Sequence, residues 1–336
     1  MQETISQATH TVNPDEGTRL ALLSPKDIKW DDRRGETQSV EQLYTKRSDF
    51  ARLAERMAKC SGLLEFRQVI HEDTGEASLK LSRASFCHVR HCPVCQWRRG
   101  LRNVARFYEA LPQIQQDHPK AAWLFLTLTV RNPPMSELRA TLGAMNKAWQ
   151  RLIQRADWPA LGFIRTTELT LGRDGNPHPH FHALLMVKPS YFKSGNYLSQ
   201  EAWTRHWQEA LRADYTPMVN IQRVKARSAK AQLAEQAGDA QAALGAAVLE
   251  TVKYSVKPSD LIADAAFLYG ITEQLHKTRF IASGGALKKA LVQDKATDKE
   301  LVEAGSVEEP EAVHEAPELG SVFFGWKRDK RQYRQV

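Results

Sequence analysis

The sequence lacks the segments that mark a membrane or secreted protein. None of its 336 residues belongs to an apolar run approaching about 18 residues, so no membrane-spanning helix is expected. The first sixteen residues are polar and of mixed charge, without the apolar stretch of a secretory signal. The chain has only four cysteines. In a protein that is not secreted, they favour thiols or a metal site over disulfides.

Acidic residues are missing from one part of the chain and concentrated in another. Between Lys80 and Arg106 there are seven Lys or Arg and no Asp or Glu, whereas Gln293 to Gly320 holds nine acidic residues and two Lys. The chain as a whole carries a formal net charge of +8. The basic character therefore belongs to the body of the protein, where it favours a polyanionic partner, and the acidic stretch is expected to be solvated.

Hydrophobic patterning divides the chain into four predicted regions. Residues 1–40 lack periodicity and are expected to form a disordered arm. Residues 41–115 form a basic segment that carries the cysteines, and residues 116–290 alternate strand and helix patterns. Residues 291–336 are expected to be an acidic linker with an aromatic and basic end, which packs on the body or touches nucleic acid.

The cysteines have the spacing of a metal site. They are Cys60, Cys87, Cys92 and Cys95. The last two form a CxxC motif, which lets two thiolates reach one tetrahedral ion, and such a site would fold a short basic segment with little core of its own. His88 and His91 are substitutes if Cys60 is not a ligand. Unligated thiols are the alternative, and a redox motif is disfavoured because no strand precedes the CxxC.

An arginine-rich helix is expected directly after the cysteines, from Trp97 to about Leu111. It would carry Arg98, Arg99, Arg102 and Arg106. The arginines at 98, 102 and 106 share one helix face and could follow a phosphate backbone. A solvated basic face is the alternative.

Two histidines stand two residues apart in a strand-like run, at His180 and His182. Residues i and i+2 of a strand point to the same face, so the two imidazoles make half of a metal site. The alternating residues point the other way and can enter a core; they are Phe181, Ala183 and Leu185. A strand with two incidental histidines is the alternative.

A second strand pattern, at residues 162–171, precedes the histidines and is joined to them by a turn-rich segment. This order predicts a β-hairpin. Glu168 can then sit across the hairpin from His180 and His182, and one carboxylate with two imidazoles suits Mn²⁺ or Mg²⁺ acting on a phosphate. A cross-strand salt bridge is the alternative reason for this glutamate.

Further strand and helix patterns along the chain predict an α+β fold. Strands are expected at 122–130 and 218–224, and helices at 41–59, 136–155, 199–212, 226–247 and 259–275. If residues 248–258 are also helical, four polar side chains share one face of that helix. They are Glu250, Lys253, Tyr254 and Lys257.

In this combination the chain resembles the HUH endonucleases and, more narrowly, the replication initiator (Rep) proteins of rolling-circle plasmids. The residues that carry the resemblance are Phe125–Thr129 with Asn132, His180-Phe-His182, Lys253-Tyr254-x-x-Lys257 and the cysteine segment Phe86–Arg99. It covers about residues 58–290, with a weaker similarity at 322–336. The resemblance implies an α+β fold, with a central antiparallel sheet flanked by helices and a small zinc-binding cysteine segment.

The resemblance also implies residue roles. The divalent metal, Mn²⁺ or Mg²⁺, would be held by Glu168, His180 and His182. Tyr254 would be the nucleophile, and Lys253 or Lys257 would lower its pKa or hold phosphate. Glu250, one turn earlier, would activate water for the closing cleavage. Zinc at the four cysteines would be structural.

The implied activity is initiation of plasmid rolling-circle replication. Such a protein binds the double-strand origin and nicks one strand, forming a 5′-phosphotyrosine link and leaving a 3′-hydroxyl primer. Its implied partners are origin DNA and a host helicase and polymerase, in the cytoplasm of a bacterium. The alternatives are a transposase or relaxase of the same superfamily, or a non-enzymatic, zinc-stabilised DNA-binding regulator, which would leave Glu168 and Tyr254 without a role.

Overall fold

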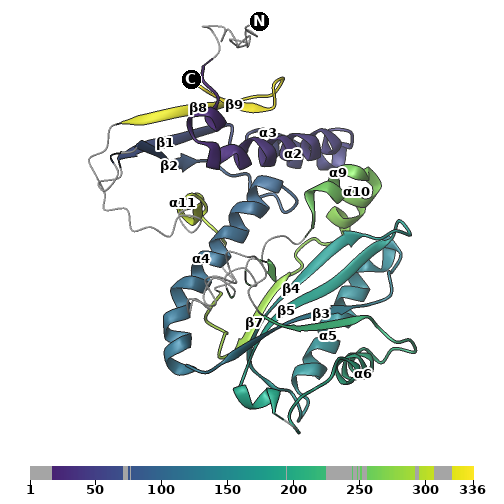
Figure 1. Cartoon of the computed structure of the whole chain (residues 1–336). Coiled ribbons are helices and arrows are strands. Elements are labelled where there is room, and N and C mark those ends of the chain that lie inside the picture. Colours follow the sequence, from purple (N-terminus) through teal and green to yellow (C-terminus); the bar gives the residue numbers. More distant parts are fainter. Residues whose placement is uncertain are drawn as a thin grey trace, which may run out of the picture.

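Two antiparallel sheets, joined by one long helix, form the framework of the protein (Figure 1). The computed structural model describes residues 17–70, 75, 77–193, 195–224, 244, 248, 250–251, 256–291, 295–305 and 320–336. The predicted class, α+β with antiparallel strands, is confirmed.

The larger sheet has five strands in the order β6–β3–β5–β4–β7, and every pair is antiparallel. Its strands are β3 (Ala122–Thr129), β4 (Ala160–Leu171), β5 (Pro177–Val187), β6 (Val219–Arg223) and β7 (Ile281–Gly285). Strands β4 and β5 form the hairpin that the sequence predicts, and the histidine strand β5 is central.

Helices α5 (Leu138–Ile153) and α6 (Gln200–Leu211) cover one face of this sheet. The ring of Phe181 on β5 lies 6.2 Å from that of Trp149 on α5 and 6.1 Å from that of Trp207 on α6. Aromatic contacts of this kind add to the free energy gained by burying the rings. Phe181, Ala183 and Leu185 are fully buried, so the predicted core face of the histidine strand is confirmed.

The opposite face of the larger sheet packs against α4 (Pro93–Asp117), which links it to the smaller sheet (Figure 1). The second half of α4 contributes Val104, Phe107, Leu111 and Ile114 to a cluster with Ile164, Leu184 and Met186 of the sheet. The helix is longer than the predicted 97–111, because Pro93 can occupy its first turn and Pro112 is accommodated within it.

The smaller sheet is assembled from both ends of the chain, in the order β2–β1–β8–β9. Its strands are β1 (Leu63–Ile70), β2 (Ala77–Ala84), β8 (Ser321–Lys327) and β9 (Gln332–Gln335). The rings of Phe66 on β1 and Phe324 on β8 are both buried and lie 5.6 Å apart. The C-terminal end therefore packs on the body, as one of the two sequence expectations states.

Helix α2 (Ile28–Tyr44) corrects the predicted N-terminal arm. Trp30 and Val40 are buried, so the prediction of disorder over residues 1–40 was wrong for residues 20–40; residues 1–16 lie outside the described residues. The helix shows no apolar periodicity because it buries polar side chains as well. Asp31 accepts a hydrogen bond from the backbone NH of Tyr333 at 2.7 Å, and Glu41 pairs with Arg328 at 2.8 Å.

Helix α11 (Asp298–Glu303) corrects the predicted acidic linker. Thr297 and Glu300 form a capping box at its start. The Glu300 carboxylate also accepts hydrogen bonds from Arg102 at 2.9 Å and Arg106 at 2.7 Å of α4. This part of the acidic stretch therefore folds against the basic helix, and residues 306–319 lie outside the described residues.

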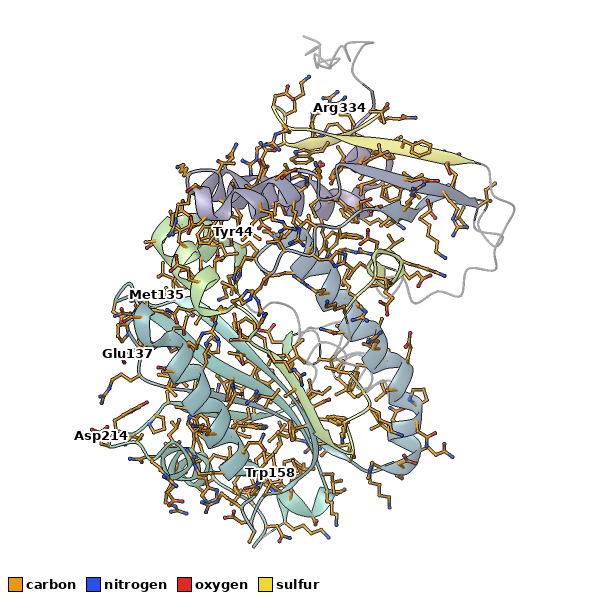
Figure 2. All side chains as sticks on the ribbon, turned by 180° about the vertical axis from the view of Figure 1, so that it is seen from behind. Tyr44, Met135, Glu137, Trp158, Asp214 and Arg334 are labelled. Atoms are coloured by element: carbon orange, nitrogen blue, oxygen red, sulfur yellow. The ribbon has the colours of Figure 1, made fainter. Side chains whose placement is uncertain are left out.

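The remaining elements are short. They are α1 (Leu20–Leu23), α3 (Ala51–Ala58), α9 (Pro258–Ala263), α10 (Ala265–Gln274) and the 3₁₀ turns η1 (Pro25–Asp27), η2 (Ser48–Phe50), η3 (Met135–Glu137) and η4 (Pro189–Phe192). The single helix predicted at 259–275 is divided at Asp264, whose side chain caps α10 by accepting from Phe267. The labelled Tyr44 of α2 (Figure 2) shares a 2.7 Å hydrogen bond with Thr272 of α10.

None of the helices in the described part of the chain combines the length and the apolar character that a bilayer crossing requires.

The C-terminal strand is held by a buried tyrosine, which gives a stability prediction. The Tyr333 hydroxyl lies 2.6 Å from the Ser61 carbonyl oxygen and 2.9 Å from its Oγ. Tyr333→Phe should lower the free energy of unfolding by about 1–3 kcal/mol, because the buried Ser61 groups lose their partner. Urea unfolding followed by circular dichroism measures this. Tyr197→Phe is the control, since Tyr197 is exposed and should change stability by less than about 0.5 kcal/mol. Equal midpoints for both variants would contradict the prediction.

Candidate functional site

Three potential metal ligands meet on the β4–β5 hairpin. Glu168 of β4 lies opposite His180 of β5 in the strand register, and His182 follows two residues later on the same face. Oε2 of Glu168 lies 3.2 Å from Nε2 of His180 and 2.8 Å from Nε2 of His182. The three ligand atoms are all within 4.8 Å of one another. The juxtaposition predicted from the hairpin is therefore confirmed.

Each imidazole is oriented by a hydrogen bond at its other nitrogen. Nδ1 of His180 donates to the backbone carbonyl of His178 at 3.2 Å, because a carbonyl oxygen can only accept. Nδ1 of His182 lies 3.1 Å from Oγ1 of Thr127 on β3, and the Phe125 ring stacks on the His182 ring at 5.2 Å. Partners of this kind fix the ring orientation of metal-binding histidines, and here they direct both Nε2 atoms toward Glu168.

The environment of Glu168 keeps its carboxylate ionised. Burial by itself favours the neutral acid, but the hydrogen bonds to His180 and His182 outweigh it and hold the pKa of Glu168 well below its usual value. The carboxylate is therefore negative at neutral pH, as a ligand for a cation must be. One carboxylate oxygen with two imidazole nitrogens fits a divalent ion such as Mn²⁺ or Mg²⁺ and leaves coordination positions for phosphate or water.

The loop that joins the two strands carries a second polar network, outside the ligand set. Nδ2 of Asn132 donates to Oδ1 of Asp174 at 2.9 Å, since a carboxylate can only accept. This fixes the amide orientation, so Oδ1 of Asn132 accepts from Nδ1 of His178 at 2.6 Å. The His178 ring lies 5.2 Å from that of His180. The network therefore fixes which nitrogen of His178 carries the proton and places the ring beside the candidate metal ligand His180.

Asp174 is the residue of this network that the sequence analysis missed. The turn-rich pattern predicts only a turn at this position, yet Asp174 accepts hydrogen bonds from Asn132 and from Asn176. The signal was present in the Asp-Gly-Asn order, because an Asp side chain in such a turn bonds the backbone two residues later. Asp174 does so with the Asn176 NH at 3.2 Å.

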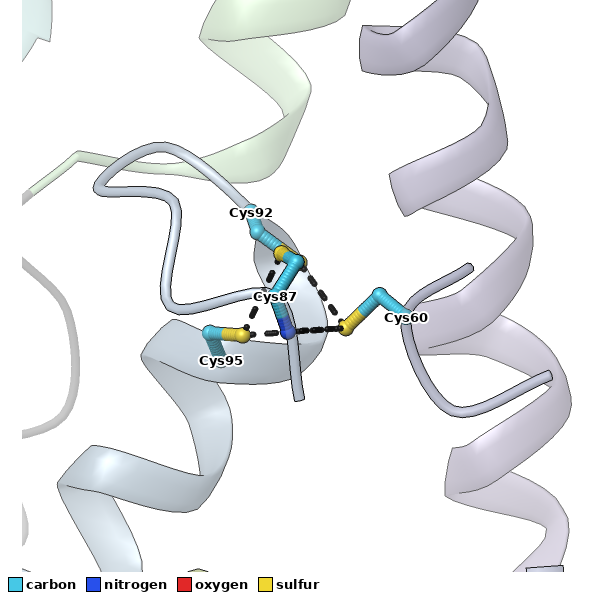
Figure 3. Close-up of side chains that lie close together, drawn as sticks. All are labelled: Cys60, Cys87, Cys92 and Cys95. Atoms are coloured by element: carbon cyan, nitrogen blue, oxygen red, sulfur yellow. Dashed lines mark hydrogen bonds between the residues drawn. The ribbon is translucent and has the colours of Figure 1, made fainter. Parts of the chain in front are cut away.

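The four cysteines converge in a buried cluster at the start of α4 (Figure 3). Sγ of Cys95, in the first turn of α4, lies 3.7 Å from Sγ of Cys60 and 3.6 Å from Sγ of Cys87. Sγ of Cys92 lies 3.7 Å from that of Cys60. A tetrahedral site with Zn–S bonds of about 2.3 Å places its sulfurs about 3.8 Å apart. The cluster could therefore hold one such metal ion.

Neither histidine of the cysteine loop is needed to complete this cluster. His88 is turned outward and its Nε2 lies 2.7 Å from Oδ1 of Asp298. His91 is buried, and neither ring nitrogen has a hydrogen-bond partner in the described part of the chain. Burial, aided by Arg90 and Arg99, lowers the pKa of His91 to about 3, so its ring is neutral. The geometry thus favours Cys60 as the fourth member.

The arginines of α4 do share a helix face, but that face is covered. Arg98 is only 3% exposed and donates to the backbone carbonyls of Leu301 and Val302. Arg102 and Arg106 bond the Glu300 carboxylate of α11. The expectation that these side chains follow a DNA backbone was wrong for this face. Arg99 is half-buried and donates to the backbone carbonyls of Val89 and Arg90.

The predicted catalytic segment is described only at its flanks, because Lys253 and Tyr254 lie outside the described residues. Glu250 is helical and exposed. Lys257 is exposed and extended, at the start of α9, and Val256 forms an isolated bridge with Leu169. The prediction that Glu250 and Lys257 share one continuous helix face was therefore wrong, because the helix does not extend to Lys257.

Comparison with known proteins identifies related chains. The family model described as Rep_1, replication protein, matches residues 78–334. A curated relative named "Protein rep" from Lactiplantibacillus plantarum is 36% identical over 287 residues, which is 82% of this chain and 85% of the relative. Another, from Lentilactobacillus hilgardii, is 31% identical over 321 residues, which is 92% of this chain and 95% of the relative. A third, from Streptococcus pneumoniae, is 34% identical over 270 residues, with 79% of each chain covered. No solved structure matches the chain.

The loop network has no room for a side chain at Gly172. A Cβ there would lie 2.5 Å from Oδ1 of Asp174 and 2.6 Å from Nδ2 of Asn132. Gly172→Ala should therefore break the Asn132–Asp174 hydrogen bond and destabilise the protein by about 1–3 kcal/mol. Thermal unfolding measures the effect. Gly143→Ala on the exposed face of α5 is the control, because nothing lies within 4 Å of its Cβ and alanine favours a helix by up to about 1 kcal/mol. A melting temperature unchanged by Gly172→Ala would refute the expected clash.

Proposed function

The chain belongs to the replication protein family Rep_1, and from this premise we propose that it initiates rolling-circle replication of a plasmid by nicking one strand of origin DNA. The single observation that carries the proposal is the cluster of Glu168, His180 and His182 on the β4–β5 hairpin. A buried ionised carboxylate with two oriented imidazoles fits a divalent metal that acts on phosphate.

A second observation supports Tyr254 as the nucleophile. Oγ1 of Thr166 donates to the carbonyl of Thr251 at 2.5 Å, and Val256 bridges to Leu169. Thr166 and Leu169 stand on either side of Glu168 in β4. Both described flanks of the Lys253–Tyr254 segment are thus attached to the strand that carries the metal-binding carboxylate.

The reaction is a transesterification. The phenolate oxygen of Tyr254 attacks the phosphorus, the bond from phosphorus to the 3′ oxygen breaks, and that oxygen takes a proton to become the 3′-hydroxyl. The 5′ phosphate stays joined to the tyrosine. A divalent ion held by Glu168, His180 and His182 would supply Lewis-acid stabilisation of the charge on the phosphate. Lys253 or Lys257 would favour the phenolate by its positive charge.

Release of the protein at the end of a round needs a second reaction at the same phosphorus. Glu250 is exposed, as a group that exchanges protons with water must be. Acting as a general base, it would take a proton from water, whose oxygen breaks the regenerated origin strand in the closing cleavage. The 3′-hydroxyl released there attacks the phosphotyrosine, and the bond from phosphorus to the Tyr254 oxygen breaks. A second nucleophilic tyrosine is then unnecessary.

The nicking proposal is tested with single-stranded origin DNA and Mn²⁺, followed by denaturing electrophoresis. Wild-type protein should form a covalent protein–DNA band, and Tyr254→Phe should lose it by at least about 100-fold because the attacking oxygen is absent. Glu168→Gln should lose nicking to a similar degree while still binding DNA, and Tyr197→Phe is the control. A covalent band of normal intensity from Tyr254→Phe would overturn the assignment. Absence of cleavage by the wild-type protein would favour a non-enzymatic regulator.

The same assay tests Glu250 separately. Glu250→Ala should nick at the normal rate but accumulate the covalent complex over time, because water is no longer activated. Exposed Glu55 on α3 gives a matched control through Glu55→Ala. An unchanged rate of release in Glu250→Ala would remove this residue from the mechanism.

We further propose that the four cysteines bind structural zinc. Cys92→Ser should reduce bound zinc from one equivalent per chain to well below one. It should also lower the melting temperature, because the zinc site stabilises this part of the fold in place of a hydrophobic core. Zinc content by mass spectrometry and thermal unfolding measure the two effects. His88→Ala should keep one equivalent, since His88 is turned away from the cluster. Full zinc content in Cys92→Ser would exclude this site.

A further inference from the structure

The smaller sheet has one covered face and one open face. Leu64, Phe66 and Phe324 point to the covered face and are fully buried. The strand register places the neighbouring residues on the opposite side, where no described helix packs. Arg83, Glu65 and Phe323 form one row across β2, β1 and β8, and Lys80, Arg67 and Ser321 form the next.

The open face is basic. Its cations are Arg67, Lys80, Arg83, Lys327 and Arg334, and Glu65 is the one acidic residue in the four strands. Arg67 and Arg334 also make contacts within the chain, which leaves Lys80, Arg83 and Lys327 as the candidate phosphate ligands. The labelled Arg334 marks this sheet in Figure 2. A one-sided sheet with so few acidic groups is complementary to a polyanion.

Two large apolar side chains lie in the middle of this basic face. Phe323 on β8 is 38% exposed and Leu63 on β1 is 52% exposed. Leu63 pairs with Gly325 and Glu65 pairs with Phe323, so the two apolar side chains are diagonal neighbours across the central strand pair. Gly325 beside them has no side chain of its own, and a Cβ there would lie 3.1 Å from Cγ1 of Val336, which is itself 63% exposed. An accessible ring among cations on a sheet is the arrangement on which unpaired bases stack.

We propose that the open face of the smaller sheet binds single-stranded DNA, with phosphates on Lys80, Arg83 and Lys327 and a base on Phe323. This inference rests on the proposed function, which supplies DNA as the partner. Single-stranded DNA is favoured over duplex because only unpaired bases offer a free face to an aromatic side chain. The candidate metal ligands belong to the larger sheet, which α4 links to the smaller sheet (Figure 1), so this surface is separate from the nicking site.

The surface is tested by fluorescence anisotropy with 5′-fluorescein-labelled dT20 and full-length protein, without divalent metal, from 50 to 300 mM NaCl. The triple variant Lys80→Ala, Arg83→Ala, Lys327→Ala should bind more weakly, and its log–log salt slope should fall by about 2, since each phosphate contact contributes about 0.7 on single strands. Phe323→Ala should weaken binding by about five-fold or more at one salt concentration, with an unchanged slope, because a stacked base contributes about 1–3 kcal/mol.

A matched control removes three cations from other surfaces, as Lys46→Ala, Arg52→Ala, Lys120→Ala, all exposed. It should leave affinity and slope within about two-fold of wild type. Equal binding by wild type, triple variant and Phe323→Ala, while the wild type still nicks origin DNA, would overturn this inference alone. An equal loss of affinity for a 20-base-pair duplex would overturn the single-strand assignment. A wild-type protein that neither binds dT20 nor nicks would overturn the proposed function and this inference together.

Discussion

The register of the β4–β5 hairpin is the constraint on which the rest of the structure depends. It pairs Glu168 with His180 on one face, and on the other it places Phe181 between Trp149 and Trp207. A shift of one residue would turn the histidines into the aromatic core and Phe181 away from it. The hydrophobic effect and the polar side chains therefore select the same strand pairing, and the candidate metal centre is positioned by the aromatic packing on the other face of the sheet.

What could be predicted from the sequence is what local patterns determine. The hairpin, the alternation of the histidine strand and the CxxC spacing each depend on residues close together in the chain, and the structure confirms their geometry. Helix α2 could not be predicted in this way. Its buried Asp31 and Glu41 are paired with Tyr333 and Arg328, which lie about three hundred residues later in the chain. No local hydrophobic period can indicate such a pair.

The arginines of α4 also show what local sequence patterns cannot predict. Their spacing gave the correct helix face, yet spacing cannot say what covers a face. Glu300 and two carbonyls of the α11 region neutralise or hydrogen-bond them. The basic surface that remains open lies instead on the smaller sheet, where cations from β2 and β8, on either side of β1, reach one face only after the strands pair. Lys80 and Lys327 are so far apart in the sequence that the sequence alone does not predict that they share one basic surface.

The smaller sheet contains the first and last strands of the described chain, and this has a consequence for how the protein is made. During synthesis β1 and β2 emerge early, but β8 and β9, with the partners of Asp31 and Glu41, emerge last. The larger sheet lies wholly between them and can fold first, which reverses the usual order in which N-terminal units form before later ones. Until the chain has been made through β9, Asp31 and Glu41 of α2 lack Tyr333 and Arg328. Closure of the smaller sheet is thus coupled to synthesis of the strands that follow the larger sheet.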